Sequence, residues 1–144
     1  PHSDLRRSRA AAENIIPTSS GAGIAVSEVI PTLKDEFGAM AFRVPTSVVS
    51  LCDFAIVTKK DVTIDQVNEV FKEAAAEPFY QGILAVTDEP LVSSDFIGNS
   101  HSAIVDLGLT KVVGGNLLKG VAWYDNEWGF SVRMLEACKL LMKV

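Results

Sequence analysis

Hydrophobic and polar positions follow a helical period most clearly in residues 61–77. Apolar residues three and four positions apart form one face, which consists of Ile64, Val67, Val70, Phe71 and Ala74. Thr63 and Gln66 have the spacing of a capping box at the start of this segment. We therefore predict an amphipathic helix over residues 61–77.

Two other segments have near-helical spacing. The first runs from Ser20 to Phe37, and Pro31 should kink it or end its first half, because proline has no backbone N–H to donate. The second runs from Ser131 to the end of the chain. Its apolar side consists of Met134, Leu135, Cys138, Leu141 and Met142. Both segments are predicted to be helical.

Strand-like segments rich in β-branched and aromatic residues lie between these helices. Residues 40–60 indicate one long strand with a bulge or two strands, and residues 83–86 indicate a short strand. Further strands are expected at Val92, 103–106, 109–113 and 117–123, with hairpin turns at 98–99 and 114–116. This mixture predicts an α+β fold with a largely antiparallel mixed sheet and helices on one face.

The composition is that of an ordinary globular protein, with 48% hydrophobic and 22% charged residues in 144 positions. One domain is the natural count for this length. No apolar run approaches the roughly 18–20 residues of a membrane span. The net charge of −5 argues against a general nucleic-acid binder, because the basic cluster of Arg6, Arg7 and Arg9 is too short to outweigh it.

Two cysteines, Cys52 and Cys138, lie in apolar periodic segments without a CxxC motif or a neighbouring histidine. We expect both to be buried small hydrophobic residues, and we expect neither a disulfide nor a metal site. Free thiols are typical of a reducing compartment, so a cytoplasmic location is expected.

An unusual aromatic turn, Trp-Tyr-Asp-Asn-Glu-Trp-Gly-Phe-Ser, occupies residues 123–131 between a predicted strand and a predicted helix. Aromatic faces beside the carboxamide of Asn126, which offers donors and an acceptor in one plane, suit a flat and partly polar ligand. The alternative is a set of core aromatic residues around a turn.

Two features indicate anion binding. The sequence Thr-Ser-Ser-Gly at 18–21 precedes a predicted helix, so its hydroxyl and backbone N–H groups either hold a phosphate or form a simple N-cap. Arg43 lies in a predicted strand among apolar neighbours and needs a partner. That partner is a structural carboxylate or a bound phosphate, which the planar guanidinium group suits.

Four stretches, in order along the whole chain, resemble glyceraldehyde-3-phosphate dehydrogenases: residues 4–22, 40–46, 89–96 and 123–129. The resemblance implies a glycolytic oxidoreductase that uses NAD and inorganic phosphate to convert glyceraldehyde 3-phosphate into 1,3-bisphosphoglycerate. It also implies a cytoplasmic homotetramer, with the arginine-rich residues 6–10 in a loop at the subunit interface near a neighbour's cofactor.

The same resemblance assigns individual site residues. Arg43 matches the arginine for the terminal phosphate of the substrate. The inorganic-phosphate site matches Ser20, Gly21 and Arg7, where Ser20 replaces the usual threonine and keeps its hydroxyl. For the cofactor, Asn126 matches the asparagine that bonds the nicotinamide carboxamide, and Phe130 stands where the family usually has tyrosine. Phenylalanine there is typical of erythrose-4-phosphate dehydrogenases, which is the alternative.

The motifs of the family's nucleophilic cysteine and activating histidine are absent from these 144 residues, as is a GxGxxG fingerprint. Neither cysteine, nor His2 or His101, has a matching context, and a surface or structural role is expected for His101. The chain thus resembles the C-terminal part of the catalytic domain, without the NAD-binding domain. We expect it to be inactive alone. The competing hypothesis is a non-catalytic module that binds anions or forms a subunit interface.

Overall fold

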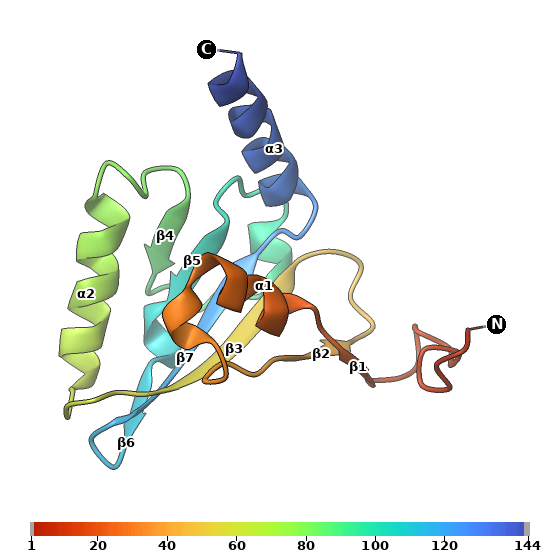
Figure 1. Ribbon diagram of the computed structural model, residues 1–144, viewed down its shortest axis with the longest axis horizontal. Coiled ribbons are helices and arrows are strands. Elements are labelled where there is room, and N and C mark those ends of the chain that lie inside the picture. The colour runs from red at the N-terminus through yellow and green to blue at the C-terminus, as the bar shows by residue number, and fades with distance from the viewer. Residues whose placement is uncertain (1, 143–144) are drawn as a thin grey trace. The chain divides into compact units, whose positions relative to one another are not determined.

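The computed structural model describes residues 2–142 (Figure 1). The chain consists of two compact units, the first ending at Ser47 and the second beginning at Val48. In the first unit, β1 (Ile16–Ser19) pairs antiparallel with β2 (Met40–Arg43). Between them lie α1 (Ala22–Val29) and the short 3₁₀-helix η1 (Pro31–Leu33). The predicted helical segment is therefore interrupted at Pro31, as its missing N–H requires.

The second unit is built on a five-stranded sheet in the order β3-β7-β5-β4, with β6 also paired to β7. Its strands are β3 (Ser50–Val57), β4 (Leu84–Thr87), β5 (Ala103–Asp106), β6 (Lys111–Val113) and β7 (Leu117–Tyr124). Strand β7 pairs with β3 over its whole length, and its other edge is shared by β5 and β6. Among the paired strands of residues 2–142, only β4 and β5 are parallel. The predicted α+β class with a largely antiparallel sheet is confirmed.

Several predicted strand boundaries are wrong for local reasons. For residues 40–60, the predicted alternative of two strands is confirmed and that of one bulged strand is wrong: the two strands lie in different sheets, separated by a stretch in which Val49 has a positive φ of 72°. Val92 is not in a strand, because its N–H donates to the Asp95 carboxylate (2.8 Å) and the 3₁₀-helix η2 (Ser93–Phe96) follows. The turn at 98–99 belongs to a crossover between parallel strands rather than to a hairpin.

The predicted turn at residues 114–116 does form a hairpin, which joins β6 to β7. Gly114 and Gly115 adopt φ values of 60° and 84°, a region that glycine enters without steric cost. Strand β6 begins at Lys111 rather than at residue 109, because the 3₁₀-helix η3 (Leu107–Leu109) occupies the preceding positions.

Helix α2 (Ile64–Ala76) covers one face of the sheet, and its predicted capping box is present. The N–H of Thr63 donates to Gln66 Oε1 (2.9 Å), and the N–H of Gln66 donates to Thr63 Oγ1 (3.2 Å). The ring of Phe71 meets that of Phe54 edge to face at 6.2 Å, above a core that contains Val105, Leu107 and Ala122. On the other face, a second cluster contains Val49, Phe96 and Ile104.

Helix α3 (Trp128–Leu141) extends beyond the sheet (Figure 1) and begins three residues before the predicted Ser131. The expectation that both cysteines are buried is wrong, because both are exposed. Cys52 lies on β3, an edge strand of the described sheet, and Cys138 lies on the projecting α3. No helix among residues 2–142 is long and apolar enough to cross a membrane.

Candidate functional site

The residues with predicted anion-binding roles all lie in the first unit, around the antiparallel pair of β1 and β2, which is called the hairpin below although α1 and η1 lie in the connection between its strands. Arg43 is the last residue of β2, is exposed, and stands directly opposite Ile16. Residues that face each other across a strand pair share one side of the sheet, and so do residues two apart along a strand. The Arg43 side chain therefore starts from the same side of the hairpin as that of Thr18. Being exposed, it has none of the desolvation cost that burial would bring.

Arg7 reaches this hairpin from the preceding turn. Its Nε donates to Thr18 Oγ1 (2.6 Å), its Nη2 donates to the same oxygen, and Nη2 also lies 3.4 Å from the carbonyl oxygen of Ser19. Thr18 and Arg43 are diagonal neighbours across the hairpin, a relation that places Cα atoms about 7–8 Å apart. The fold thus brings two arginines, 36 positions apart in the chain numbering, to neighbouring places on one side of the hairpin.

Ser20 and Gly21 lie beyond the other end of β1, where α1 begins. The Ser20 hydroxyl oxygen accepts the N–H of Ala22 (3.1 Å), and Gly21 is the N-cap residue without a side-chain cap of its own. Space around Gly21 is open, with no atom within 4 Å of where a Cβ would lie. Backbone N–H groups at a helix start attract anions. Thr18 and Ser19 belong to β1, so only half of the predicted Thr-Ser-Ser-Gly cradle adjoins the helix.

These groups do not converge on a single point. Ser20 follows the partner of Arg43, Ile16, by four strand positions, or roughly 13 Å at the rise of an extended chain. Arg7 is bonded between them, at Thr18 and Ser19. The pair of strands therefore has two candidate anion positions, one at Arg43 and one near Ser20 and Gly21, and Arg7 is bonded between them.

The aromatic turn lies in the second unit and is organised by Asp125, a residue whose role the sequence analysis missed. Its side chain is buried (4% exposed) and accepts three backbone N–H groups, from Trp128 (2.8 Å), Gly98 (2.9 Å) and Glu127 (3.0 Å). These bonds, that of Trp128 first and then that of Gly98, lower the pKa of Asp125. The local signal was an aspartate shortly before a predicted helix, because an aspartate side chain can accept the backbone N–H groups two and three residues later, as an N-cap residue does.

The two candidate cofactor residues are exposed, Asn126 just before α3 and Phe130 within its first turn. Asn126 follows the buried Asp125, and its Oδ1 lies 3.5 Å from the Ser50 hydroxyl group. Phe130 is 65% exposed. An exposed amide and an exposed ring face are groups that a nicotinamide can bond and contact, so the residues present fit one end of that cofactor.

The aromatic turn combines both interpretations of the sequence. Trp123 is a core residue, because its ring stacks on Phe96 at 5.3 Å and its indole N–H donates to Asp106 Oδ2 (3.1 Å). Trp128 is 53% exposed and donates to the Ser100 hydroxyl group (3.1 Å). His101 has a structural contact, with Nδ1 2.9 Å from Asn99 Oδ1. Residues 2–142 contain no group of three side chains placed to bind a metal ion.

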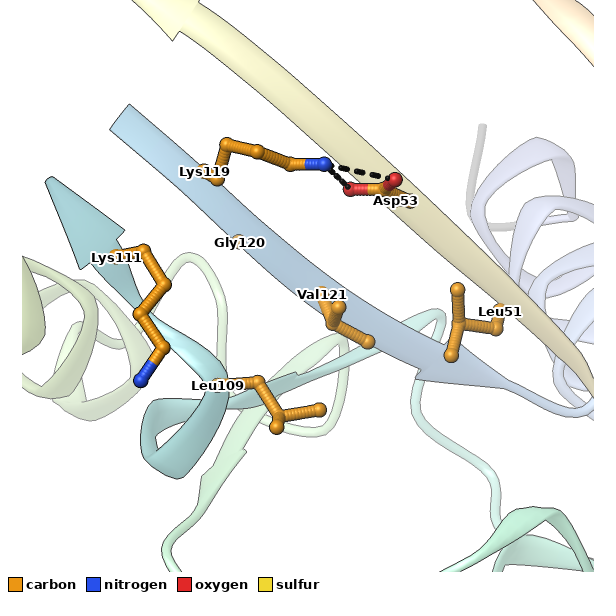
Figure 2. A pocket seen from close by; sticks show the side chains of 7 residues that line it. All are labelled: Leu51, Asp53, Leu109, Lys111, Lys119, Gly120 and Val121. Carbon is orange, nitrogen blue, oxygen red and sulfur yellow. Dashed lines mark hydrogen bonds and ion pairs between the residues drawn. The ribbon is translucent and has the colours of Figure 1, made fainter. Parts of the chain in front are cut away.

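A shallow hollow lies on the sheet face of β3 and β7 (Figure 2). Leu51, Leu109 and Val121 line it, and Lys119 Nζ bonds Asp53 across the two strands at 3.0 Å. Lys111 stands opposite Lys119 in register, and Figure 2 shows its side chain extending away from that lysine, as expected for two like charges. The hollow is an open apolar surface with charges at its rim.

Known proteins resemble the chain over nearly its whole length. The family model described as glyceraldehyde 3-phosphate dehydrogenase, C-terminal domain, matches residues 1–126. A glyceraldehyde-3-phosphate dehydrogenase of Zymomonas mobilis is 50% identical over 142 residues, which are 99% of this chain and 42% of the relative. Glyceraldehyde-3-phosphate dehydrogenase 2 of Bacillus subtilis is 50% identical over 136 residues, 94% of this chain and 40% of the relative.

The corresponding enzyme 2 of Staphylococcus aureus strain MRSA252 is 49% identical over 139 residues, 96% of this chain and 40% of the relative. The chain thus spans about two fifths of the length of the curated relatives that it matches. The matched family model covers the hairpin with both arginines, the whole sheet and the turn as far as Asn126. The chain belongs to the glyceraldehyde 3-phosphate dehydrogenase family and corresponds to its C-terminal domain.

Proposed function

We propose that this chain is the C-terminal part of the catalytic domain of an NAD-dependent glyceraldehyde-3-phosphate dehydrogenase. The intact enzyme converts glyceraldehyde 3-phosphate, NAD and inorganic phosphate into 1,3-bisphosphoglycerate and NADH in glycolysis. The observation that carries the proposal is the pair of anion positions on the hairpin, one at Arg43 and one at Ser20 and Gly21, in a chain about half identical to enzymes of that name.

Two separated anion positions suit the reaction. The substrate carries its phosphate at one end and its reactive aldehyde at the other, so the attacking inorganic phosphate must bind away from the substrate phosphate. Arg43 binds the terminal phosphate of the substrate through its exposed guanidinium group. Ser20, Gly21 and Arg7 bind the inorganic phosphate. Holding the two dianions apart limits their mutual repulsion while keeping both near the carbonyl carbon.

The cofactor contacts of this chain are few. Asn126 bonds the nicotinamide carboxamide and Phe130 contacts the ring region, while most of NAD binds to a nucleotide-binding domain outside these 144 residues. When bound, NAD accepts a hydride from the substrate. Asn126 and Phe130 orient the nicotinamide end and supply no proton or electron themselves.

The covalent chemistry requires a thiolate that this chain does not supply. Partial desolvation by its neighbours, although the residue is exposed, and secondarily the Asp53 carboxylate raise the pKa of the Cys52 thiol, which is the opposite of activation. Cys138 lies exposed on α3 without a described histidine contact. We propose that the nucleophile and its activating histidine belong to another part of the enzyme and that the isolated chain is inactive.

We also propose that the intact enzyme is a cytoplasmic homotetramer. The hollow of Figure 2 supports an interface there, because Leu51, Leu109 and Val121 form an open apolar centre, and the Asp53–Lys119 pair lies beside it. A symmetric contact between copies would bury this face on both subunits at once. Residues 6–10 are proposed to contact a neighbouring subunit. The two exposed free cysteines are compatible with a reducing compartment.

The proposal is tested by purifying the full-length protein and measuring NADH formation from glyceraldehyde 3-phosphate. Activity should require both NAD and inorganic phosphate, and the 144-residue chain should show none. A folded full-length protein without this activity would refute the proposal and favour a non-catalytic module. Erythrose 4-phosphate is assayed in parallel, because Phe130 lacks the phenolic hydroxyl group usual in the family. A higher kcat/KM for the tetrose would establish the alternative substrate.

A further inference from the structure

Thr18 is a buried residue that bonds an exposed arginine, and we propose that it is a positioning residue for the inorganic-phosphate site. Its side chain holds the Arg7 guanidinium group in the orientation that receives phosphate near Ser20. This inference rests on the proposed function, because the phosphate ligand of Arg7 is assigned there.

The Thr18 hydroxyl group accepts hydrogen bonds from Arg7 and donates its own hydrogen elsewhere. Its Oγ1 accepts from Arg7 Nε (2.6 Å) and from Arg7 Nη2, while its own hydroxyl hydrogen points to the carbonyl oxygen of Ser19 (3.3 Å). The residue is only 7% exposed and sits inside a strand, so its hydroxyl group has a fixed place. Arg7 lies eleven positions earlier in a loop, and its long side chain would otherwise sample many rotamers.

The two bonds to Thr18 decide which edge of the guanidinium group remains available. They occupy Nε and Nη2, whereas Arg7 Nη1 makes no hydrogen bond within the described part of the chain. Nη1 carries two donors, which can receive an anion. Thr18 precedes Ser20 by two positions, or about 7 Å along an extended chain, so the bonds to Thr18 keep the guanidinium group near Ser20.

A hydroxyl group also holds the guanidinium group without cancelling its charge. The one carboxylate near Arg7 in the described residues is Asp4, with Arg7 Nε 3.6 Å from its Oδ2, and that pair is partly exposed. Asp4 Oδ1 accepts the N–H of Arg6 (2.9 Å), and that backbone bond is the main cause that lowers the pKa of Asp4. The Asp4 carboxylate is thus engaged by a backbone N–H of its own turn. The neutral Thr18 hydroxyl group is therefore the main acceptor that positions the Arg7 guanidinium group.

The test uses the full-length enzyme and separate KM values for phosphate and for glyceraldehyde 3-phosphate. Thr18→Val keeps the β-branched shape and removes the hydroxyl group. Loss of hydrogen bonding to a charged group is expected to raise the phosphate KM about tenfold, with less than a twofold change in the aldehyde KM. Thr18→Ser should restore the phosphate KM. Ser19→Ala, which removes a hydroxyl group on the other side of β1, is the matched control.

The Arg7→Ala variant distinguishes an error in the positioning role of Thr18 from an error in the proposed phosphate-binding role of Arg7. If Arg7→Ala leaves the phosphate KM unchanged, the assigned role of Arg7 is wrong and Thr18 has nothing to position. If Arg7→Ala raises it and Thr18→Val does not, only the role of Thr18 is refuted. A proportional change of both KM values in Thr18→Val, without rescue by serine, also refutes it. Thr18→Ala replaces the valine variant if that variant fails to fold.

Discussion

Removing the Asp125 carboxylate should destabilise the second unit more than removing any exposed carboxylate. Asp125→Ala deletes three hydrogen bonds from backbone N–H groups to a buried charged acceptor. At roughly 1.5 kcal/mol for each bond to a charged group, the loss is about 4.5 kcal/mol. Asp125→Asn keeps one oxygen but turns an amide NH₂ group toward one of the N–H donors, so we expect about 2 kcal/mol.

The assay is chemical denaturation of the chain at neutral pH, followed by tryptophan fluorescence. Trp123 is a suitable reporter because it is stacked in the core beside the sheet. Asp53→Asn is the matched control, since it breaks an ion pair whose side chains are about half exposed and should cost less than about 1 kcal/mol. Equal free energies of unfolding for Asp125→Asn and Asp53→Asn would refute the structural role of Asp125.

The pH dependence gives an independent check of the same bonds. The pKa of Asp125 is lowered from its ordinary value of 3.8 in the folded protein, so the folded state favours the ionised carboxylate. Its contribution is complete above that value and is lost as the pH falls below it toward the folded pKa. Asp125→Asn should therefore flatten the loss of stability below pH 3.8 relative to the wild type. An unchanged acid profile would contradict the assignment.

Three further changes follow from the same structure. Gly129→Ala would place a Cβ 2.9 Å from the carbonyl oxygen of His101, so overpacking should outweigh the better helix propensity of alanine and cost about 1–2 kcal/mol by denaturation. Gly38→Ala meets no atom within 4 Å and should cost nothing, so equal losses would contradict the steric reasoning. Thr63→Ala removes the capping box of α2 and should cost about 1 kcal/mol; an unchanged denaturation midpoint would exclude this. Arg43→Ala in the full-length enzyme should raise the KM for glyceraldehyde 3-phosphate about tenfold or more while leaving the melting temperature unchanged, because Arg43 is exposed; a normal KM would refute its assigned role.

Elements specified by local chemistry could be predicted from the sequence. Helix α2 has both an apolar face and a capping box, and the β6–β7 turn has two consecutive glycines with positive φ. The start of α3 was placed too late because the bonds of Asp125 to Glu127 and Trp128 extend the helix into the aromatic turn. An aspartate in this position resembles a simple polar loop residue until its buried partners are known.

Features that depend on distant pairing could not be predicted. The parallel arrangement of β4 and β5 results from the crossover formed by residues 88–102. The sequence of this crossover resembles a strand followed by a hairpin turn, so it predicts antiparallel neighbours instead. The exposure of Cys52 depends on its place at a sheet edge, which periodicity does not report. In the same way, Arg7 and Arg43 become neighbours only through the pairing of β1 with β2.

A common arrangement links the two candidate ligand regions, although they lie in different units. In each, an exposed residue with a proposed ligand-binding role is positioned by a buried polar residue that has no such role. Thr18, 7% exposed, bonds Arg7, and Asp125, 4% exposed, bonds the backbone N–H groups of the two residues after Asn126. Burial strengthens the positioning effect of Thr18 and Asp125. A buried polar group that loses its hydrogen-bond partner costs free energy, so the bond to that partner is rarely broken. Arg7 and Asn126 alone resemble ordinary surface residues. Their fixed positions, which the proposed ligand binding would need, are explained only by the buried residues Thr18 and Asp125.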